Sequence, residues 1–290
     1  MTDADWIAAD WGTSRLRLWG MAGSEPVWRD GSGDGSAGLE PEAFAPALEA
    51  LTARHAPAPR PVLVCGSAGA REGWRTAPYR AVPCAPGPAA ADLTRIETAA
   101  HDVALLPGLS QDAPPDIMRS EETQVAGLLA ADPEFDGVAI LPGTHTKWVR
   151  VSAGEVVSFR TAMTGELHAL IAGRSLLRHS LGTWDDDTFD AAVADGIAHP
   201  QRLAAEIFAI RAADILRGHA HGRARLSGLL IGAELAAMRP YWLGQRLVLI
   251  GEADHMDRYA AALAAQGAPT ERRGGEVCTL AGLWAARALL

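Results

Sequence analysis

Two short turns of this 290-residue chain combine glycine with hydroxyl side chains directly after apolar segments. The first turn contains Gly12, Thr13 and Ser14, and the second contains Gly143, Thr144, His145, Thr146 and Lys147. Consecutive backbone N–H groups in such a turn form a concavity for an anion, and glycine lets a phosphate approach the backbone closely. Hydroxyl groups and a lysine ammonium add further donors. The chemistry that this pattern indicates is phosphate binding.

One acidic residue, Asp10, stands at the mouth of the first turn. A carboxylate there repels a bare phosphate unless a cation lies between them, and Mg²⁺ held by one carboxylate through its waters meets that need. Two phosphate turns and a metal-facing aspartate together indicate a nucleoside triphosphate site. The same residues also suit ordinary structural turns, and Lys147 equally suits a solvated strand. Neither GxxxxGK[ST] nor GxGxxG occurs, which disfavours P-loop and dinucleotide-binding folds.

The segments that must position these turns have similar patterns. Residues 6–9 and 138–141 are apolar runs before the turns, and residues 15–19 and 147–151 alternate strictly after them. Alternation on one side of a glycine turn predicts a β-hairpin. The two strand–turn–strand units lie about 130 residues apart, which suggests a duplicated architecture.

Further apolar patterns extend this arrangement along the chain. Strands are expected at residues 62–65, 103–109, 156–160, 226–231 and 247–250. Helices are expected at residues 41–53, 120–131, 164–178, 188–219, 257–266 and 277–290, the second of them with Ser120 as its N-cap. Strands that enter glycine turns and then helices describe an α/β protein.

The composition limits the class of protein. Against 26 basic side chains there are 35 acidic ones, so the net charge is −9. This balance favours neither a nucleic-acid partner nor an anionic membrane. The three cysteines, Cys65, Cys84 and Cys278, have no metal-binding spacing, which predicts reduced thiols in a cytoplasm. The chain shows no signal-peptide pattern and no apolar run of about 18 residues, so no transmembrane helix is expected.

Several motifs resemble one family closely. DWGTS begins at Asp10 and LPGTHTKWV at residue 141, and they resemble the phosphate-1 and phosphate-2 motifs of the sugar kinase/actin/Hsp70 superfamily. Together with CGSAGAREGW (65–74), SEETQ (120–124) and MTGEL (163–167), they resemble 2-dehydro-3-deoxygalactonokinase. IGAEL (231–235) and IGEAD (250–254) extend the resemblance over nearly the whole chain.

The resemblance implies an ATP-dependent, Mg²⁺-requiring kinase that phosphorylates the terminal C6 hydroxyl of 2-dehydro-3-deoxy-D-galactonate in galactonate catabolism. It implies two ribonuclease-H-like domains flanking an ATP and substrate cleft, which we expect at residues 1–132 and 133–290. The ATP phosphates would bind at the two glycine turns, with Mg²⁺ held by Asp10 through water. The adenosine would face two further turns, formed by Gly232, Ala233 and Glu234 and by Gly251.

Acceptor activation and substrate binding are assigned to charged residues. Related sugar kinases place their catalytic base at a helix start before the phosphate-2 turn, which here holds Glu121 and Glu122. Spacing to Gln124 favours Glu122 over Glu121, and Glu166 is either a rival base or a ligand for a substrate hydroxyl. An ordinary acidic first turn of a helix would look the same.

The substrate is itself a carboxylate, which a guanidinium grips well. Arg71 is the first candidate, with Arg15 and Arg119 behind it.

Three other functions remain open on the sequence. The chain could be a kinase for another sugar or sugar acid on the same fold, a non-catalytic sensor of sugar and nucleotide, or a phosphatase acting on phosphoanhydrides. The sequence leaves the oligomeric state and the selectivity between the galactonate and gluconate derivatives undetermined.

Overall fold

The computed structural model describes residues 4–55, 59–218 and 220–290. The chain divides into two compact units. Unit 1 comprises Met1–Asp136, Val151–Ser158 and Arg273–Leu290, and unit 2 comprises Gly137–Arg150 and Phe159–Arg272. The first change of unit falls close to the expected boundary at residue 132. The final segment, which we expected in the second domain, groups with unit 1.

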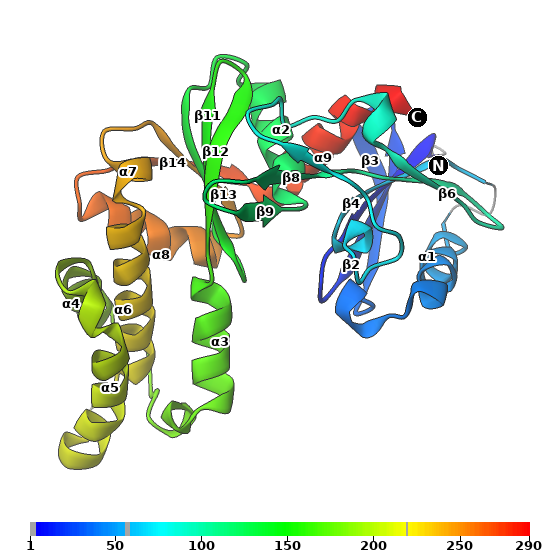
Figure 1. Ribbon diagram of the computed structural model, residues 1–290. Coiled ribbons are helices and arrows are strands. Elements are labelled where there is room, and N and C mark those ends of the chain that lie inside the picture. Colours follow the sequence, from blue (N-terminus) through cyan, green and yellow to red (C-terminus); the bar gives the residue numbers. More distant parts are fainter. Residues whose placement is uncertain (1–3, 56–58, 219) are drawn as a thin grey trace. The chain divides into compact units, whose positions relative to one another are not determined.

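Unit 1 is built on a six-stranded sheet with the strand order β3-β2-β1-β4-β7-β6 (Figure 1). Its strands are β1 (Trp6–Trp11), β2 (Leu16–Ala22), β3 (Glu25–Ser32), β4 (Val62–Gly66), β6 (Thr94–Glu97) and β7 (Asp102–Leu105). Strand β1 pairs antiparallel with β2 and parallel with β4, so the sheet is mixed. The hairpin predicted around the first glycine turn is confirmed.

Both faces of β1 are covered, because alternate side chains pack into two separate apolar clusters. Ile7 belongs to the cluster that contains residues of α1 (Phe44–Thr52). Trp6 belongs to the opposite cluster, which contains residues of α9 (Gly275–Ala286). Asp10 shares the parity of Trp6 along the strand, so its side chain lies on the face that α9 covers.

The helix that carries the two candidate bases, α2 (Glu121–Ala131), packs closely on α9. A small sheet of β5 (Tyr79–Ala81), β8 (Gly108–Gln111) and β9 (Asp116–Met118) precedes it. A Cβ at Gly127 of α2 would lie 1.9 Å from the carbonyl oxygen of Cys278. A Cβ at Gly282 of α9 would lie 1.9 Å from the carbonyl oxygen of Thr123. The two helices touch through their backbones at these glycines, which explains why α9 belongs to unit 1.

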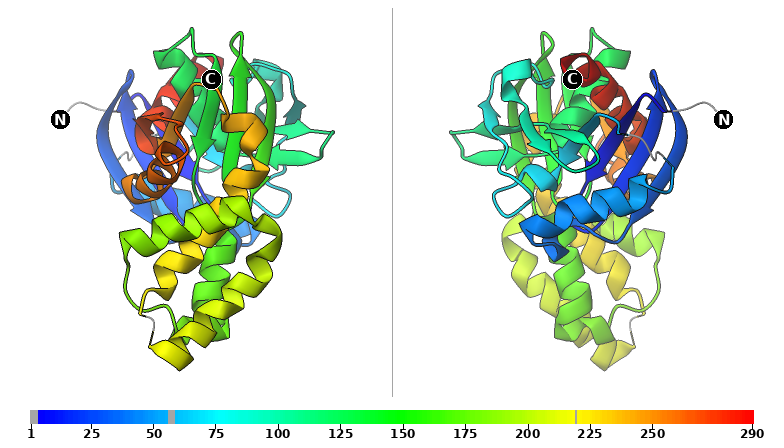
Figure 2. Two further views of the ribbon diagram at one scale, coloured as in Figure 1. Left: turned by 90° about the vertical axis from the view of Figure 1, so that its left-hand side faces the viewer. Right: turned by 90° about the vertical axis from the view of Figure 1, so that its right-hand side faces the viewer.

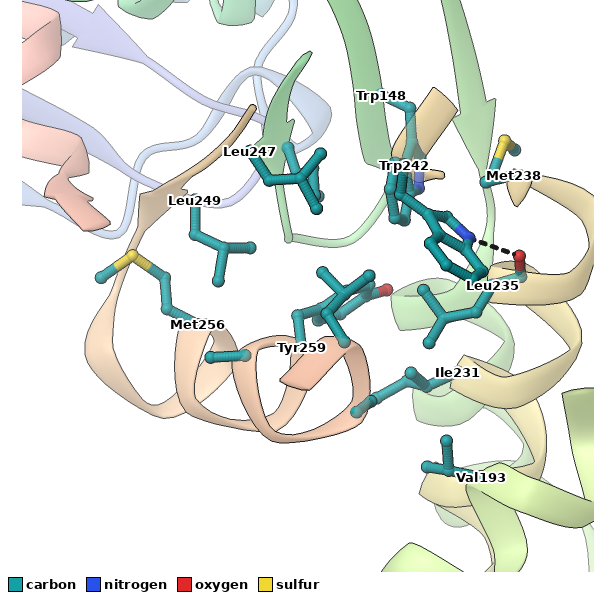
Figure 3. Close-up of a cluster of buried hydrophobic side chains, with 14 of the residues drawn as sticks. Trp148, Val193, Ile231, Leu235, Met238, Trp242, Leu247, Leu249, Met256 and Tyr259 are labelled. Atoms are coloured by element: carbon teal, nitrogen blue, oxygen red, sulfur yellow. Dashed lines mark hydrogen bonds between the residues drawn. The ribbon is translucent and has the colours of Figure 1, made fainter. Parts of the chain in front are cut away.

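Unit 2 is centred on a five-stranded mixed sheet with the order β12-β11-β10-β13-β14. Its strands are β10 (Gly137–Leu141), β11 (Thr146–Ser152), β12 (Glu155–Ala162), β13 (Leu247–Gly251) and β14 (Thr270–Gly274). The parallel pair β10 and β13 reads as two continuous buried runs, which is typical of strands covered on both faces. In Figure 3, Leu247 and Leu249 of β13 face Tyr259 and Met256 across the core.

The remaining helices of unit 2 gather beyond one end of its sheet (Figures 1 and 2). They are α3 (Thr164–Arg174), α4 (Asp186–Ala198), α5 (Leu203–Arg217) and α6 (Gly222–Ala237), and α7 (Arg239–Trp242) and α8 (Ala253–Ala264) lie nearer to the strands. Pro200 separates α4 from α5 and divides the single helical stretch predicted over residues 188–219. No helix within the described ranges is both long and apolar enough to span a membrane.

The strand predicted at residues 226–231 is wrong, because this segment lies inside α6. The apolar run is buried all round, and a short run of that kind does not distinguish a strand from a buried helix. Helix α4 packs directly on the glycines of α6. A Cβ at Gly232 would lie 2.4 Å from the carbonyl oxygen of Val193, and a Cβ at Gly228 would lie 2.5 Å from that of Phe189. These glycines permit close packing of two helices and do not form a turn.

Candidate active site

The phosphate-1 turn joins β1 to β2 and is supported from below by a glycine-rich loop. The Gly12 N–H donates to the carbonyl of Arg15 at 2.9 Å, which closes the hairpin. Two amides of the loop, those of Ser36 and Ala37, donate to the carbonyls of Gly12 and Thr13. Thr13 and Ser14 are exposed at the tip. The turn is therefore held in one shape while its hydroxyl groups remain accessible.

Asp10 lies at the centre of a buried polar cluster that the sequence did not reveal. Only 5% of Asp10 is exposed. Its Oδ2 pairs with Arg17 Nη2 at 3.0 Å, and its Oδ1 accepts a hydrogen bond from Ser120 Oγ at 3.3 Å. Burial raises the pKa of Asp10, while Arg17, Ser120 and Cys65 oppose that rise. Arg17 lies opposite Asp10 in the β1–β2 register, a pairing that alternation across the hairpin predicts in principle.

Ser120 occupies an unusual backbone position directly before α2. Its φ is 94°, in the region that favours glycine. Ser120 is the N-cap residue of α2, as predicted, but its side chain makes no cap hydrogen bond and donates to Asp10 instead. Backbone strain of this kind is concentrated at functional sites in proteins.

Glu122 and Glu121 differ sharply in their surroundings. Glu122 is 3% exposed, and its Oε1 accepts hydrogen bonds from the Ser120 N–H at 3.1 Å and from Thr123 Oγ1 at 2.9 Å. Its Oε2 is buried without a partner in the described part of the chain and borders a void of about 10 Å³, roughly the room that one water needs. Burial, followed by the charge of Glu121, raises the pKa of Glu122 to about 7. Glu121 is half-buried and accepts a hydrogen bond from the Arg119 N–H at 3.0 Å.

The three candidate arginines lie in different environments. Arg119 is committed to the fold: its guanidinium donates to the carbonyls of Leu106 at 3.1 Å and Ala77 at 2.9 Å, and it covers the ring of Tyr79. These partners occupy the guanidinium, so the predicted substrate contact of Arg119 gains no support from the structure. Arg71 is highly exposed and pairs with its neighbour Glu72, and Arg15 is exposed at the first turn. Both guanidinium groups remain accessible to a ligand.

The phosphate-2 turn lies between β10 and β11 and rests on the start of α3. A Cβ at Gly165 would lie 2.1 Å from the carbonyl oxygen of Gly143, and the Glu166 N–H donates to the carbonyl of Thr144 at 2.8 Å. Glu166 also bonds to His145 through its side chain. The turn is thus fixed from both sides, with Thr144 and His145 exposed.

Thr146 and Lys147, in contrast, point into unit 2. Thr146 is 1% exposed and Lys147 is 6% exposed. Lys147 Nζ donates to Thr161 Oγ1 at 2.8 Å, so neither a solvated strand position nor a free phosphate ligand describes it. The predicted contacts of these two residues with phosphate stay predictions, and their burial and hydrogen bonds give those contacts no support.

A cavity of about 300 Å³ opens beside the phosphate-2 turn. Gly143 and Thr144 line it together with the start of α3, the middle of α6 and the start of α8. Its polar side includes His168 and Arg258. His168 Nε2 is buried without a hydrogen-bond partner among the described residues. Burial, with the nearby charge of Arg258, lowers the pKa of His168, so the ring is neutral near pH 7 and can accept or donate one hydrogen bond.

The two predicted adenosine turns have different outcomes. Gly251 ends β13, and a Cβ there would lie 3.6 Å from the carbonyl oxygen of Pro142, so this residue does border the phosphate-2 turn. Gly232, Ala233 and Glu234 lie within α6 and form no turn. Glu234 is 5% exposed, and Trp148 Nε1 and the Tyr259 hydroxyl both donate to its carboxylate. These core residues enclose the Glu234 side chain, so its predicted contact with ATP has no support in this structure.

Asp10 is the residue predicted to hold Mg²⁺, so the fit of a metal ion depends on its surroundings. Within the described ranges no group of three or more His, Cys, Asp or Glu side chains could hold a metal ion. Mg²⁺ on a nucleotide needs no such cage, because phosphates and water supply most of its ligands. The Asp10 carboxylate accepts from Ser120 and Arg17 and keeps lone pairs for a metal-bound water. The residues present fit a water-mediated contact.

Comparison with known proteins gives one consistent family. The 2-keto-3-deoxy-galactonokinase family profile matches residues 10–286. The Rhizobium meliloti (strain 1021) protein named "Probable 2-dehydro-3-deoxygalactonokinase DgoK1" is 37% identical over 301 residues, covering 99% of this chain and 98% of its own. The 2-dehydro-3-deoxygalactonokinase of Escherichia coli (strain K12) is 33% identical over 287 residues, covering 97% and 96%.

Solved structures agree on the fold. A crystal structure assigned to 2-dehydro-3-deoxygalactonokinase from Sinorhizobium meliloti superposes with a TM-score of 0.91 at 35% identity, covering 98% of this chain and 96% of the other. A Porphyromonas gingivalis protein assigned as an N-acetylglucosamine kinase gives a TM-score of 0.50 at 11% identity, covering 97% and 99%. The predicted sugar kinase/actin-type α/β fold is confirmed, with a mixed sheet at the centre of each unit.

Proposed function

The chain belongs to the 2-keto-3-deoxy-galactonokinase family, and on that premise we propose how its residues transfer phosphate to the C6 hydroxyl of 2-dehydro-3-deoxy-D-galactonate. It is an ATP-dependent kinase of a sugar acid in galactonate metabolism. The O6–Pγ bond forms, the bond from Pγ to the bridging oxygen of ADP breaks, and the hydroxyl proton passes to a base. We propose that the protein carries out this reaction in the cytoplasm.

We assign the nucleotide to the cavity of unit 2. It is large enough for a purine nucleoside, has an apolar wall formed by Leu230 and Ile231, and ends at the phosphate-2 turn. The N–H groups of Gly143 and Thr144 suit the phosphates, while Arg258 and His168, whose Nε2 has no partner among the described residues, suit the polar parts of the nucleoside. We retain Gly251 as a neighbour of the phosphates.

The acidic cluster of unit 1 carries the assignment of acceptor activation. We assign Glu122 as the base, because its pKa of about 7 lets it accept a proton near neutral pH and its Oε2 has no partner in the described residues. Glu121 is the alternative, since it is half-buried whereas Glu122 Oε2 is enclosed. Asp10 would hold a water of Mg²⁺, and Mg²⁺ neutralises charge on the transferred phosphoryl group.

The substrate carboxylate needs a cation that is not committed to the fold. Arg71 and Arg15 meet that condition, and Arg119 does not. We assign Arg71 to the carboxylate. Glu166 bonds to His145 through one carboxylate oxygen and keeps lone pairs for a substrate hydroxyl, so it remains a candidate ligand for that hydroxyl, and we rank it behind Glu121 as a base.

The experiment that tests this function is ADP release from Mg-ATP with a panel of acceptors: 2-dehydro-3-deoxy-D-galactonate, its gluconate epimer, plain hexoses and no acceptor. A rate that depends on the galactonate derivative supports the proposal. Equal rates with both epimers would widen the substrate class, and release without an acceptor would indicate a phosphatase. No release with any acceptor, together with nucleotide binding, would indicate a sensor.

A further inference from the structure

A buried chain of hydrogen bonds runs beneath the phosphate-2 turn. Glu234 of α6 lies at its end, where Oε1 accepts from Trp148 Nε1 and Oε2 accepts from the Tyr259 hydroxyl, each at 2.7 Å. The side chain of Thr164 is close enough to this carboxylate to lower its pKa. The Tyr259 oxygen also lies 2.9 Å from Thr146 Oγ1. Four elements of unit 2 meet here: β11, α3, α6 and α8.

The number of hydrogens on each group decides which residue donates in each of these hydrogen bonds. The Tyr259 hydroxyl has one hydrogen and gives it to Glu234, so it accepts the hydrogen of Thr146. With Glu234 in its carboxylate form, Oε1 accepts from Trp148 Nε1 and Oε2 accepts from the Tyr259 hydroxyl. Burial raises the pKa of Glu234, and the hydrogen bonds of Thr164, Trp148 and Tyr259 oppose that rise. The chain is thus ordered from Thr146 through Tyr259 to Glu234.

Two residues of this chain lie on either side of the phosphate-2 turn. Thr146 is the first residue of β11, directly after the turn. Thr164 is the first residue of α3, whose next residues contact the turn at Gly143 and Thr144. Figure 3 shows Tyr259 extending from α8 across the core to the side chains around Trp148. A single carboxylate therefore anchors both the strand that leaves the turn and the helix that supports it.

We propose that Glu234 is the positioning residue of the phosphate-2 turn and that, acting through Tyr259 and Thr164, it holds residues 143–146 in the shape that receives the ATP phosphates. This inference rests on the proposed assignment of ATP to that turn. Glu234 does not itself line the cavity, whereas its partners Tyr259 and Thr164 do, so it acts through them. Burying a carboxylate in a core costs free energy because the charge loses its water. The two oxygens of Glu234 in turn hold three donor side chains in fixed positions.

The test compares Glu234→Gln, which leaves the cavity lining unchanged, and Tyr259→Phe, which removes one hydroxyl from that lining, with Trp242→Phe as a matched control. Trp242 belongs to the same core and donates a buried hydrogen bond to the Leu235 carbonyl at 2.8 Å, drawn in Figure 3, but it does not line the cavity. We expect both test variants to raise KM for ATP about tenfold while KM for the sugar acid stays unchanged. The control should lower Tm without changing KM for ATP.

Hydrogen exchange in the absence of ATP separates the two proposals. Backbone amides over residues 142–148 should exchange faster in Tyr259→Phe than in wild type, and at the wild-type rate in Trp242→Phe. Unchanged exchange in Tyr259→Phe, or faster exchange with unchanged KM for ATP, would overturn the positioning role. Failure of the proposed function would appear differently, as a wild-type chain that neither binds ATP nor releases ADP while the exchange difference persists.

Discussion

Ser120 Oγ lies 3.3 Å from Asp10 Oδ1, although 110 residues separate them in the chain. This contact joins the aspartate beside the phosphate-1 turn to the residue that precedes the helix of Glu121 and Glu122. The proposed metal-facing carboxylate and the proposed base therefore share one polar cluster in unit 1. Substitutions in that cluster give direct tests.

Glu122→Gln should lower kcat by about 100-fold or more, because the amide cannot accept the proton of the C6 hydroxyl. The fall in wild-type kcat below about pH 7 should disappear from its residual activity, since the group with that pKa is gone. The measurement is the pH profile of kcat for Glu122→Gln beside Glu121→Gln. Loss of activity in Glu121→Gln alone would transfer the role of base to Glu121.

The raised pKa of Glu122 also predicts how stability depends on pH. Its pKa rises from 4.5 to about 7, chiefly through burial, so the folded state binds this proton more tightly than the unfolded state. The stabilising contribution is present below pH 4.5 and is lost as the pH rises through about 7, with a limit of ~3 kcal/mol. Glu122→Gln stays neutral and should gain stability relative to wild type between about pH 5 and about pH 8. Urea unfolding at both pH values measures this gain, and a constant difference would contradict it.

The backbone conformation of Ser120 predicts that glycine is more stabilising than alanine at this position, which is the reverse of the usual order. Its φ of 94° favours glycine, so Ser120→Gly should be more stable than Ser120→Ala by about 1 kcal/mol. Both variants lose the hydrogen bond to Asp10, so their difference isolates the backbone. Urea unfolding of the pair tests the prediction, and a more stable alanine variant would show that the position is not strained.

Gly232 and Gly173 form a matched pair of helical glycines. A Cβ at Gly232 would collide with the backbone of Val193, whereas a Cβ at Gly173 meets nothing within 4 Å. Gly232→Ala should therefore lower the free energy of unfolding by about 1–3 kcal/mol. Gly173→Ala should raise it by up to about 1 kcal/mol, since alanine favours a helix. Thermal or urea unfolding checks both, and equal effects would refute the packing of α4 on α6.

Local patterns predicted the glycine turns and their hairpins well, because two strictly alternating segments joined by a glycine turn rarely form any other structure. They failed at residues 226–231, where an apolar run buried on all sides satisfies a strand and a helix equally. The pairing of Asp10 with Arg17 follows from the hairpin register, but the contact of Asp10 with Ser120 joins residues far apart in the chain, which no local pattern contains. The cavity lined by His168 and Arg258 depends in the same way on how α3 and α8 pack.

The return of α9 to unit 1 has a consequence for the order of folding. Gly127 of α2 packs against Cys278 of α9, and these two residues lie far apart in the chain. Closing so long a loop costs chain entropy before the contact can offset it, so contacts of this kind form late in folding. We therefore expect the helix that carries Glu121 and Glu122 to be secured only after the local hairpins of the two glycine turns have formed.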